Sequence, residues 1–559
     1  MSTKSNPALV AIIRGAIIRI ETGFGEAMNL FSGKMERSVG LTGVIIISLS
    51  AMLGSGIFVL PALAAGMLGP GIWLAYLLAA IVVLPGALSK AELATAMPTS
   101  GGSYAYVEKT YGPILGSIAG LGLWSSFLLK SAFALIGFGA YLAIITQAFG
   151  LENINVTYAA LSLLLLIIGI NIIGVKKVKA VQAPIVGASV VFLILIIIMS
   201  IFKGLVDWNK PIGGGAWNTG AIGIVETAAM VFVAYAGVTK VAAIGEEVKD
   251  PGRNLPLGML ISLGLATLLY IGVTYVMLAT IPVSSIEHRE DPIYVFSEFV
   301  GGSWIGLIAA ILAVLTMASM ALAGVLASSR FLFGMARDNL LPTAMENVHP
   351  KFETPHWAII TTGFAMAISI IYLPIADIAK LASGFKIVIF ILIHTCIIVL
   401  RMTKSKHTWY NPEYFCPLFP FVQLFGIGSG IVLIYIMGSK AYMGAAIAIA
   451  LGLILWFSYG RRHTVSRETP WNSLLNQMQN PTETEHQRRE VVFRACDLGG
   501  KNHLNVKEFI KAMETLGFEL NSDEIRNVFH VADVNADGVI DIEEFLSIVE
   551  GEIGLSSSE

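Results

Sequence analysis

The stretch VGLTGVIIISLSAMLGSGIFVLPALAAGML, residues 39–68, is long and apolar enough to cross a lipid bilayer, which takes about 20 residues. Gly54, Ser55 and Gly56 interrupt it near the middle, although glycine in a helix interior costs about 1 kcal/mol relative to alanine. Backbone that leaves a helix inside a membrane needs polar partners from protein or from a wet cavity. The interruption therefore predicts a binding site, and close packing against another helix is the alternative explanation.

The two halves of this interrupted helix present opposite partial charges to the break. The half that starts near Ile57 directs free N–H groups and the positive end of its dipole into the break, which favours a carboxylate. The half that ends near Met52 offers carbonyl groups, which favour an ammonium group or another cation. A zwitterion would match both ends.

The composition is that of a polytopic membrane protein with an acidic tail. Of 559 residues, 55% are hydrophobic and 13% are charged, whereas soluble domains have about 25% charged residues. Residues 481–559 carry 17 acidic and 7 basic side chains, a net charge of -10, and residues 1–480 carry a net charge of +8. The tail is therefore predicted to be a separate soluble domain.

Twelve apolar segments follow an N-terminal run, residues 8–20, which contains Arg14 and Arg19 and is predicted to form an amphipathic helix at the membrane surface. The predicted spans are residues 39–68, 70–96, 114–149, 156–174, 180–203, 220–245, 256–281, 303–335, 356–373, 377–401, 418–438 and 441–460.

Lysine and arginine concentrate in alternate loops, such as residues 174–179 and 401–407, so the positive-inside rule places both termini in the cytoplasm of a multi-pass protein of the cell (inner) membrane. The predicted domains are residues 1–38, the N-terminal helix; 39–460, the transmembrane domain; 461–482, a linker; and 483–559, the tail.

The sixth span repeats the anomaly of the first. Gly237 lies in its middle, close to the polar residues Thr239 and Lys240. Four spans lie between the first and the sixth, so the two segments enter the membrane from opposite sides. Interrupted helices at matching positions of two oppositely oriented halves indicate an inverted-repeat transporter with a site near the membrane midplane.

Four motifs carry a family resemblance: GSGIF at 54–58, PTSGGSYAY at 98–106, AYAG with EEVKDPGRNLP within 234–256, and SRFLFGMARDNLLP at 329–342. In this order they resemble the amino acid-polyamine-organocation (APC) transporter superfamily over residues 39–460. The resemblance implies an all-α, LeuT-type fold of about 12 transmembrane helices, five plus five in an inverted repeat and two appended. It also implies secondary active transport of amino acids or related amines, by symport or antiport.

Carried over by position, the resemblance implies a substrate site made from the two interruptions. The amide N–H groups of Ser55 and Gly56 would bind the substrate carboxylate, and carbonyl groups near Met52, Val233 and Ala236 would bind its ammonium group. The complete set of implied substrate-binding residues is Met52, Gly54, Ser55, Gly56, Ile57, Val233, Ala234, Tyr235, Ala236 and Gly237.

The ion-coupling signatures of the superfamily are incomplete in this chain. Ser189 stands where proton-coupled relatives place a lysine in span 5, and Ser319 is the hydroxyl that lies near the level of the sodium site in span 8. Thr239 stands where some relatives place a carboxylate, which favours neutral over cationic amino acids.

Charged residues inside a membrane are costly and are functional candidates by default. Lys130 in span 3 and Lys240 in span 6 are therefore further coupling candidates, although Lys240 also has the alternative of a structural ion pair with Glu247. Lys386 and His394, both in span 10, are secondary candidates.

The tail contains DVNADGVIDIEE, residues 533–544, which matches the EF-hand calcium loop at every ligand position. A first loop, residues 497–508, has Gly499, Lys501 and Asn502 where oxygen ligands and the turn glycine are usual, so we do not expect it to bind calcium. The sequence predicts an EF-hand pair with one Ca²⁺ site, whose ligands are Asp533, Asn535, Asp537, Val539, Asp541 and Glu544.

Calcium-loaded sensor EF-hands open an apolar groove that binds basic amphipathic helices. We expect calcium to change how the tail docks on residues 6–31 or on the linker, and thereby to shift the transport cycle. The predicted partners are an amino acid and membrane lipid, with no nucleic acid, and no constellation of residues suggests an enzyme. The alternatives are an amino acid-sensing receptor, an inorganic-ion carrier of the same fold, and an EF-hand that only stabilises the protein.

Overall fold

The computed structural model describes residues 37, 39–97, 102–151, 154–174, 178–213, 216, 219–352, 354–404, 409–464, 469–479, 485–497, 500–516, 528–535 and 537–550. The predicted amphipathic helix at residues 8–20 lies outside the described residues.

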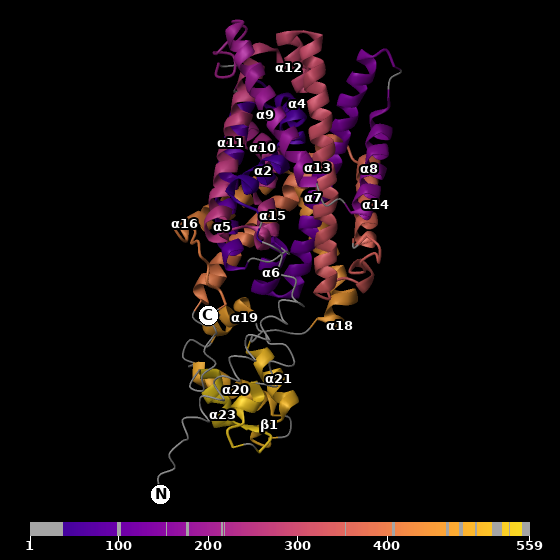
Figure 1. Cartoon of the computed structure of the whole chain (residues 1–559). Helices are drawn as coiled ribbons and strands as arrows, with labels where there is room; N and C mark the ends of the chain where they lie inside the picture. Colours follow the sequence, from indigo (N-terminus) through magenta and orange to yellow (C-terminus); the bar gives the residue numbers. More distant parts are fainter. Residues whose placement is uncertain are drawn as a thin grey trace, which may run out of the picture.

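The described residues are mainly helical, and the two strands among them have two residues each (Figure 1). The membrane part contains α2 (Leu41–Met52), α3 (Ser55–Phe58), α4 (Leu60–Leu68), α5 (Ile72–Ala96), α6 (Ser103–Tyr111), α7 (Pro113–Ala148), α8 (Val156–Ile173), α9 (Val178–Phe202), α10 (Gly220–Val231), η2 (Phe232–Glu247), α11 (Pro251–Thr280), η3 (Val283–Ser285), α12 (Pro292–Gly301), α13 (Ser303–Arg337), η4 (Thr343–Met345), α14 (His356–Tyr372), α15 (Ile375–Met402), α16 (Phe421–Met437), α17 (Ser439–Leu455), η5 (Trp456–Gly460) and α18 (Arg461–His463). The rest contains α19 (Pro470–Gln479), α20 (Glu485–Cys496), β1 (His503–Leu504), α21 (Val506–Thr515), β2 (Ile540–Asp541) and α23 (Ile542–Glu550).

Nine helices of the described chain are long and apolar enough to cross a membrane, and the bent pair Leu41–Met52 and Ser55–Leu68 makes ten. The all-α polytopic architecture is thus confirmed. Two further apolar helices, α14 and α16, have 17 residues each. Such a helix is about 25 Å long, a little short of the roughly 30 Å hydrocarbon core. The total of twelve spans therefore stays a prediction.

The first span is interrupted where the sequence predicts it. Its two halves meet at 45°. Gly54, between α2 and α3, has φ 155° and ψ -128°, a backbone conformation that residues with a Cβ rarely adopt. Glycine at this position therefore permits the chain to leave the first helix and to start the second at Ser55.

The sixth span differs from the prediction of a break at Gly237. The α-helix α10 ends at Val231, and the chain continues as the 3-10 helix η2 without a second bent pair among the described spans. The interruption is thus a change of helix type that begins at Phe232. A 3-10 helix has poorer hydrogen-bond geometry than an α-helix, and a long stretch within a span often marks a hinge.

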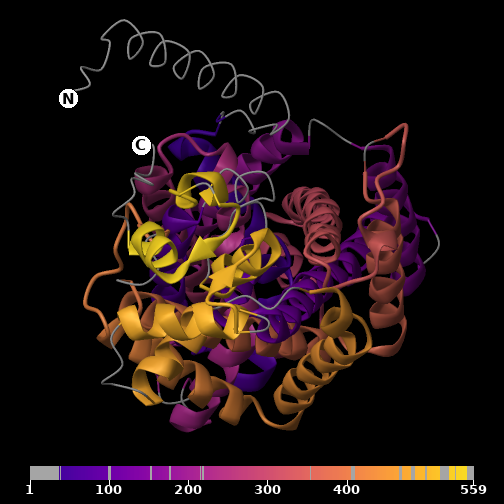
Figure 2. The same ribbon diagram turned by 90° about the horizontal axis from the view of Figure 1, so that it is seen from below.

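The interrupted spans pack against each other inside the bundle. The first-span helix α2 contacts η2 and α11, and the long helices α7 and α13 pack together beside them, while α8 and α14 form one flank of the bundle (Figures 1 and 2). Large apolar side chains on the outer surface, such as Leu165 and Leu268, are more than 70% exposed, as lipid-facing residues are.

The tail has its own hydrophobic core, which contains Phe493, Phe509, Phe529 and Phe545. Strands β1 and β2 pair in antiparallel fashion, with His503 opposite Asp541 and Leu504 opposite Ile540. This short ladder joins the two loops of the predicted EF-hand pair. Viewed from below, the tail elements lie over the ends of the membrane helices (Figure 2).

Candidate functional site

The two interruptions meet face to face, in a region that we call the junction and define as residues 51–57 and 233–237. A Cβ atom on Gly237 would overlap the backbone of Ala51, and a Cβ on Gly56 would lie 3.0 Å from the Cβ of Ala234. The glycine of each span thus lies against an alanine of the other. The structure thus brings the two interrupted segments that the resemblance assigns to the substrate site into contact.

Tyrosine hydroxyl groups bind backbone carbonyl groups at the break in span 1. Tyr270 Oη donates to the Met52 carbonyl oxygen at 2.7 Å, and Tyr76 Oη donates to the Gly56 oxygen at 2.9 Å. Since a carbonyl oxygen has two lone pairs, the Met52 oxygen retains one acceptor position for a ligand.

On the other side of the junction, Ser383 of α15 bridges the transition from α10 to η2. Its hydroxyl donates to the Met230 carbonyl oxygen at 2.8 Å and accepts the Val233 N–H at 3.1 Å. Tyr235 Oη donates to the Tyr76 carbonyl oxygen at 3.1 Å. The backbone at the start of η2 is therefore held by side chains from neighbouring helices, as buried irregular backbone requires.

Lys130, predicted as a coupling candidate, lies at the junction. Its Nζ atom donates to the Ala51 carbonyl oxygen at 2.8 Å and to the Ala234 carbonyl oxygen at 3.5 Å. The side chain comes from α7 and is 5% exposed. One ammonium group thus bridges both interrupted spans, at carbonyl groups beside those that the resemblance assigns to the substrate ammonium.

The hydrogen bonds of the two serine coupling candidates involve residues outside the junction. Ser189 Oγ shares a hydrogen bond of 2.8 Å with Thr316 Oγ1, whereas the Ser319 carbonyl oxygen accepts a hydrogen bond from Gln182 Nε2 at 3.2 Å. The hydroxyl that meets Ser189 is therefore one turn before Ser319 on α13. Lys240 follows the junction on η2.

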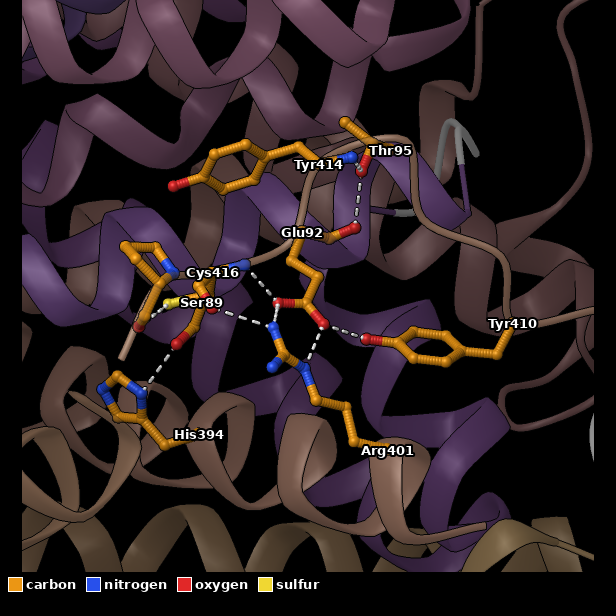
Figure 3. Close-up of polar contacts among 9 residues, drawn as sticks. Ser89, Glu92, Thr95, His394, Arg401, Tyr410, Tyr414 and Cys416 are labelled. Carbon is orange, nitrogen blue, oxygen red and sulfur yellow. Dashed lines mark hydrogen bonds and ion pairs between the residues drawn. The ribbon is translucent and has the colours of Figure 1, made fainter. Parts of the chain in front are cut away.

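A second polar cluster ties α5 to α15 and to the loop between α15 and α16 (Figure 3). The fully buried Glu92 accepts two hydrogen bonds from Arg401, at 2.8 and 2.6 Å, one from Tyr410 Oη at 2.5 Å and one from the Cys416 N–H at 2.7 Å. Burial raises the pKa of the Cys416 thiol to about 11, and burial together with the Glu92 carboxylate raises the pKa of Tyr410. The cluster acts as a buried cross-link between α5, α15 and the following loop.

The second tail loop has the donor set that calcium requires. Asp533 accepts the N–H groups of Asp537 and Gly538 at 3.0 and 2.9 Å, and Glu544 Oε1 accepts the Val534 N–H at 3.0 Å. Gly538 has φ 83° at the sharp turn. In the described part of the chain, no three carboxylate, imidazole or thiol groups lie close enough together to hold a metal. Binding of an ion by the loop carboxylates therefore stays a prediction. All the predicted ligand atoms are oxygens, which is the ligand type that Ca²⁺ prefers.

The first tail loop contains a cation of its own. Lys501 Nζ lies 3.3 Å from Glu508 Oε1, the carboxylate at the last ligand position. The N–H groups of Lys501 and Asn502 donate to the Asp497 carboxylate and hold its pKa below the usual value. The lysine ammonium thus already pairs with the carboxylate at the last ligand position, which supports the prediction that this loop binds no calcium.

Comparison with known proteins decides the family. The family model for amino acid permeases matches residues 39–471. The chain belongs to the amino acid permease family. A model of an EF-hand domain pair matches residues 488–550 of the permease. The resemblance carried by the four sequence motifs is confirmed, as is the expectation of a membrane transporter and not an enzyme.

Three similar proteins show how widely the family varies. The branched-chain amino acid permease BcaP of Bacillus subtilis is 28% identical over 473 residues, which are 81% of this permease and 99% of the relative. The methylthioribose transporter of Bacillus subtilis is 28% identical, covering 78% and 95%. Cationic amino acid transporter 3, mitochondrial, of Arabidopsis thaliana is 28% identical, covering 66% and 63%.

Sequence reasoning missed the residues that hold the junction of the permease together. Tyr76, Tyr270 and Ser383 lie on other helices, and the sequence separation between Tyr270 and its acceptor Met52 is 218 residues. The available signal was a tyrosine or serine within an otherwise apolar span. Such a side chain needs a hydrogen-bond partner when it is buried, but the sequence does not identify the partner.

Proposed function

We propose that the permease is a secondary active transporter of amino acids, with the junction as its substrate site within a LeuT-type five-plus-five inverted repeat. The observation that carries the proposal is the meeting of the two interruptions, with Gly56 against Ala234 and Gly237 against Ala51. Two interrupted helices that meet in this way can separate or rotate around a bound ligand.

The substrate would lie between the two interruptions. The helix α3 begins at Ser55, and the first N–H groups of a helix have no acceptor within it, so those of Ser55 and Gly56 would bind the α-carboxylate. Carbonyl groups near Met52, Val233 and Ala236 would bind the α-ammonium group. Lys130, Ser189, Lys240 and Ser319 remain the coupling candidates, and the position of Lys130 at two of the junction carbonyls supports it most directly.

The names of the relatives support an amino acid as the substrate class, because they include a branched-chain amino acid permease and a cationic amino acid transporter. We further propose a cell (inner) membrane location with both termini in the cytoplasm, following the distribution of basic loop residues.

We also propose that calcium binding to the tail regulates transport. Asp533, Asn535, Asp537, Val539, Asp541 and Glu544 would hold the ion, which would supply a positive cross-link between the two ends of the loop. The proposed route to the membrane domain is the linker helix α19, which packs against α6 and α15. The ring centres of Trp471 in α19 and Tyr111 in α6 are 5.5 Å apart, and the side chains of Ser473 and Leu474 are buried. The predicted docking of the tail on residues 6–31 involves a segment that lies outside the described residues.

The variant Glu544→Gln is expected to weaken calcium binding by at least about 100-fold, since even the loss of an outer-shell group at a metal site costs about 10–100-fold in affinity. The matched control is Lys501→Gln in the first loop, which is expected to leave the affinity unchanged. Calorimetric titration of the full chain with calcium measures both variants. Equal affinities in Glu544→Gln and the unmodified protein would contradict the proposed ligand set.

The variant Trp471→Ala is expected to remove most of the calcium dependence of uptake, because it deletes the aromatic contact between α19 and α6. Met478→Ala is the control, since Met478 lies on the same helix and is 70% exposed. Uptake by each variant is compared in calcium and in chelator. If Trp471→Ala responds to calcium as strongly as Met478→Ala, the linker helix is not the route.

The experiment that tests the proposed function is uptake of a panel of radiolabelled amino acids into liposomes that hold the full chain, with calcium or chelator on the side of the tail. We expect uptake of at least one amino acid, at a rate that changes with calcium. Uptake of amino acids that is indifferent to calcium would reduce the tail to a stabilising module. Absence of amino acid uptake in both conditions would contradict the transport proposal.

A further inference from the structure

Three buried lysines from three helices gather beside the junction. Lys90 of α5, Lys130 of α7 and Lys386 of α15 are 0%, 5% and 1% exposed. Lys90 Nζ donates to Thr239 Oγ1 of η2 at 3.2 Å, and Lys130 Nζ binds the junction carbonyl groups. Two of the three side chains thus contact the same 3-10 helix that forms one side of the junction.

Aromatic rings connect Lys386, the third lysine, to Lys90 and to the start of η2. The Nζ atoms of Lys90 and Lys386 lie 4.7 and 5.6 Å from the ring centre of Phe390, so the two lysine side chains end at the same ring. Lys386 Nζ is also 4.7 Å from the ring centre of Phe127. The ring of Phe390 lies 5.4 Å from that of Phe232, the first residue of η2. The cluster therefore borders the junction on the side of α5 and α15.

The cluster lacks compensating negative charge. In the described part of the chain, none of the three lysines forms an ion pair with a carboxylate. Glu92 lies two residues beyond Lys90, but its carboxylate is engaged by Arg401, Tyr410 and the Cys416 N–H. Buried charges are normally paired, because an unpaired ion in a low-dielectric interior is very costly.

We infer that the permease is built for amino acids that carry a second carboxylate, and that Lys386 and Lys90 bind this side-chain carboxylate. The inference rests on the proposed function and names the substrate class of the same site. Lys130 already places one cation on the carbonyl groups of Ala51 and Ala234. A substrate with a net negative charge would compensate the cluster, whereas a neutral or cationic amino acid would leave its positive charge in place or add to it.

The test compares uptake of radiolabelled L-glutamate, L-aspartate, L-leucine and L-lysine into liposomes holding the full chain. We expect the acidic amino acids to be taken up at least about tenfold faster than leucine, and lysine slowest. In Lys386→Met, the glutamate-to-leucine ratio is expected to fall about 10- to 100-fold, as for loss of a charge-assisted hydrogen bond. The control Lys440→Met alters an exposed lysine that pairs with Asp377, and we expect it to leave the ratio unchanged.

The outcomes separate this inference from the proposed function. Leucine or lysine uptake without glutamate or aspartate uptake would overturn the inference and leave the transport proposal standing. Uptake of no amino acid would overturn both. Thermal stabilisation by chloride in place of glutamate would assign the cluster to an inorganic anion and overturn the inference as well. If Lys386→Met does not fold, the relative uptake of glutamate, leucine and lysine by the unmodified protein still tests the inference.

Discussion

Replacing Gly237 by alanine is expected to lower amino acid uptake by at least about 100-fold, since a misplacement of about 1 Å at a functional site has an effect of this size. The added Cβ would overlap the backbone of Ala51, and backbone cannot move aside as a flexible side chain does. The two interrupted spans must therefore separate, which pulls the Ala51 and Ala234 carbonyl groups away from Lys130. The measurement is uptake into liposomes.

The matched control is Gly428→Ala in α16, where an added Cβ would meet no atom within 4 Å. We expect this variant to transport normally. Because Gly237→Ala is also expected to cost about 1–3 kcal/mol of stability through overpacking, its thermal unfolding in detergent should be recorded beside its uptake. A folded Gly237→Ala protein with normal uptake would show that the close contact of the two spans is not needed for transport.

Replacing Glu92 by glutamine is expected to destabilise the permease by about 3–5 kcal/mol, the range found when one partner of a buried ion pair is removed. Arg401 would keep its charge beside a neutral amide, and Tyr410 Oη and the Cys416 N–H would lose a charged acceptor. The control is Lys440→Gln, which breaks an exposed pair with Asp377 worth at most about 1 kcal/mol.

Thermal unfolding of the two variants in the same detergent measures the difference. The structure predicts a large fall in the unfolding temperature for Glu92→Gln and almost none for Lys440→Gln. Similar unfolding temperatures would mean that the cluster in Figure 3 does not stabilise the packing of α5 on α15 and the following loop.

The features that the sequence predicts well are those set by local backbone chemistry. Gly54 adopts a conformation that favours glycine, and the first span breaks at that residue. The alternative explanation, close packing of helices, applies to Gly56 and Gly237, whose missing side chains let the two spans touch. Lys501 was recognised as incompatible with a calcium loop, and its ion pair with Glu508 agrees with that interpretation.

The features that the sequence does not predict depend on contacts between distant segments. Glu92 and Arg401 are 309 residues apart, and neither carries a local signal that names the other. The sequence predicts a break of the sixth span at Gly237, but its helix changes type at Phe232. The serine that binds the backbone there is on α15, about 150 residues away, and no local signal in the sixth span indicates it. The partner of Ser189 was not predicted either: its hydroxyl meets that of Thr316 on α13, 127 residues away.

The most direct test of the account is the number of amino acid molecules taken up per protein molecule, measured with radiolabelled substrate in sealed liposomes that contain the full chain. A transporter with its substrate site at the junction should take up many molecules per protein, and Gly237→Ala should reduce this uptake to background. Saturation at one bound molecule per protein, without further uptake, would contradict the account and indicate an amino acid-sensing receptor.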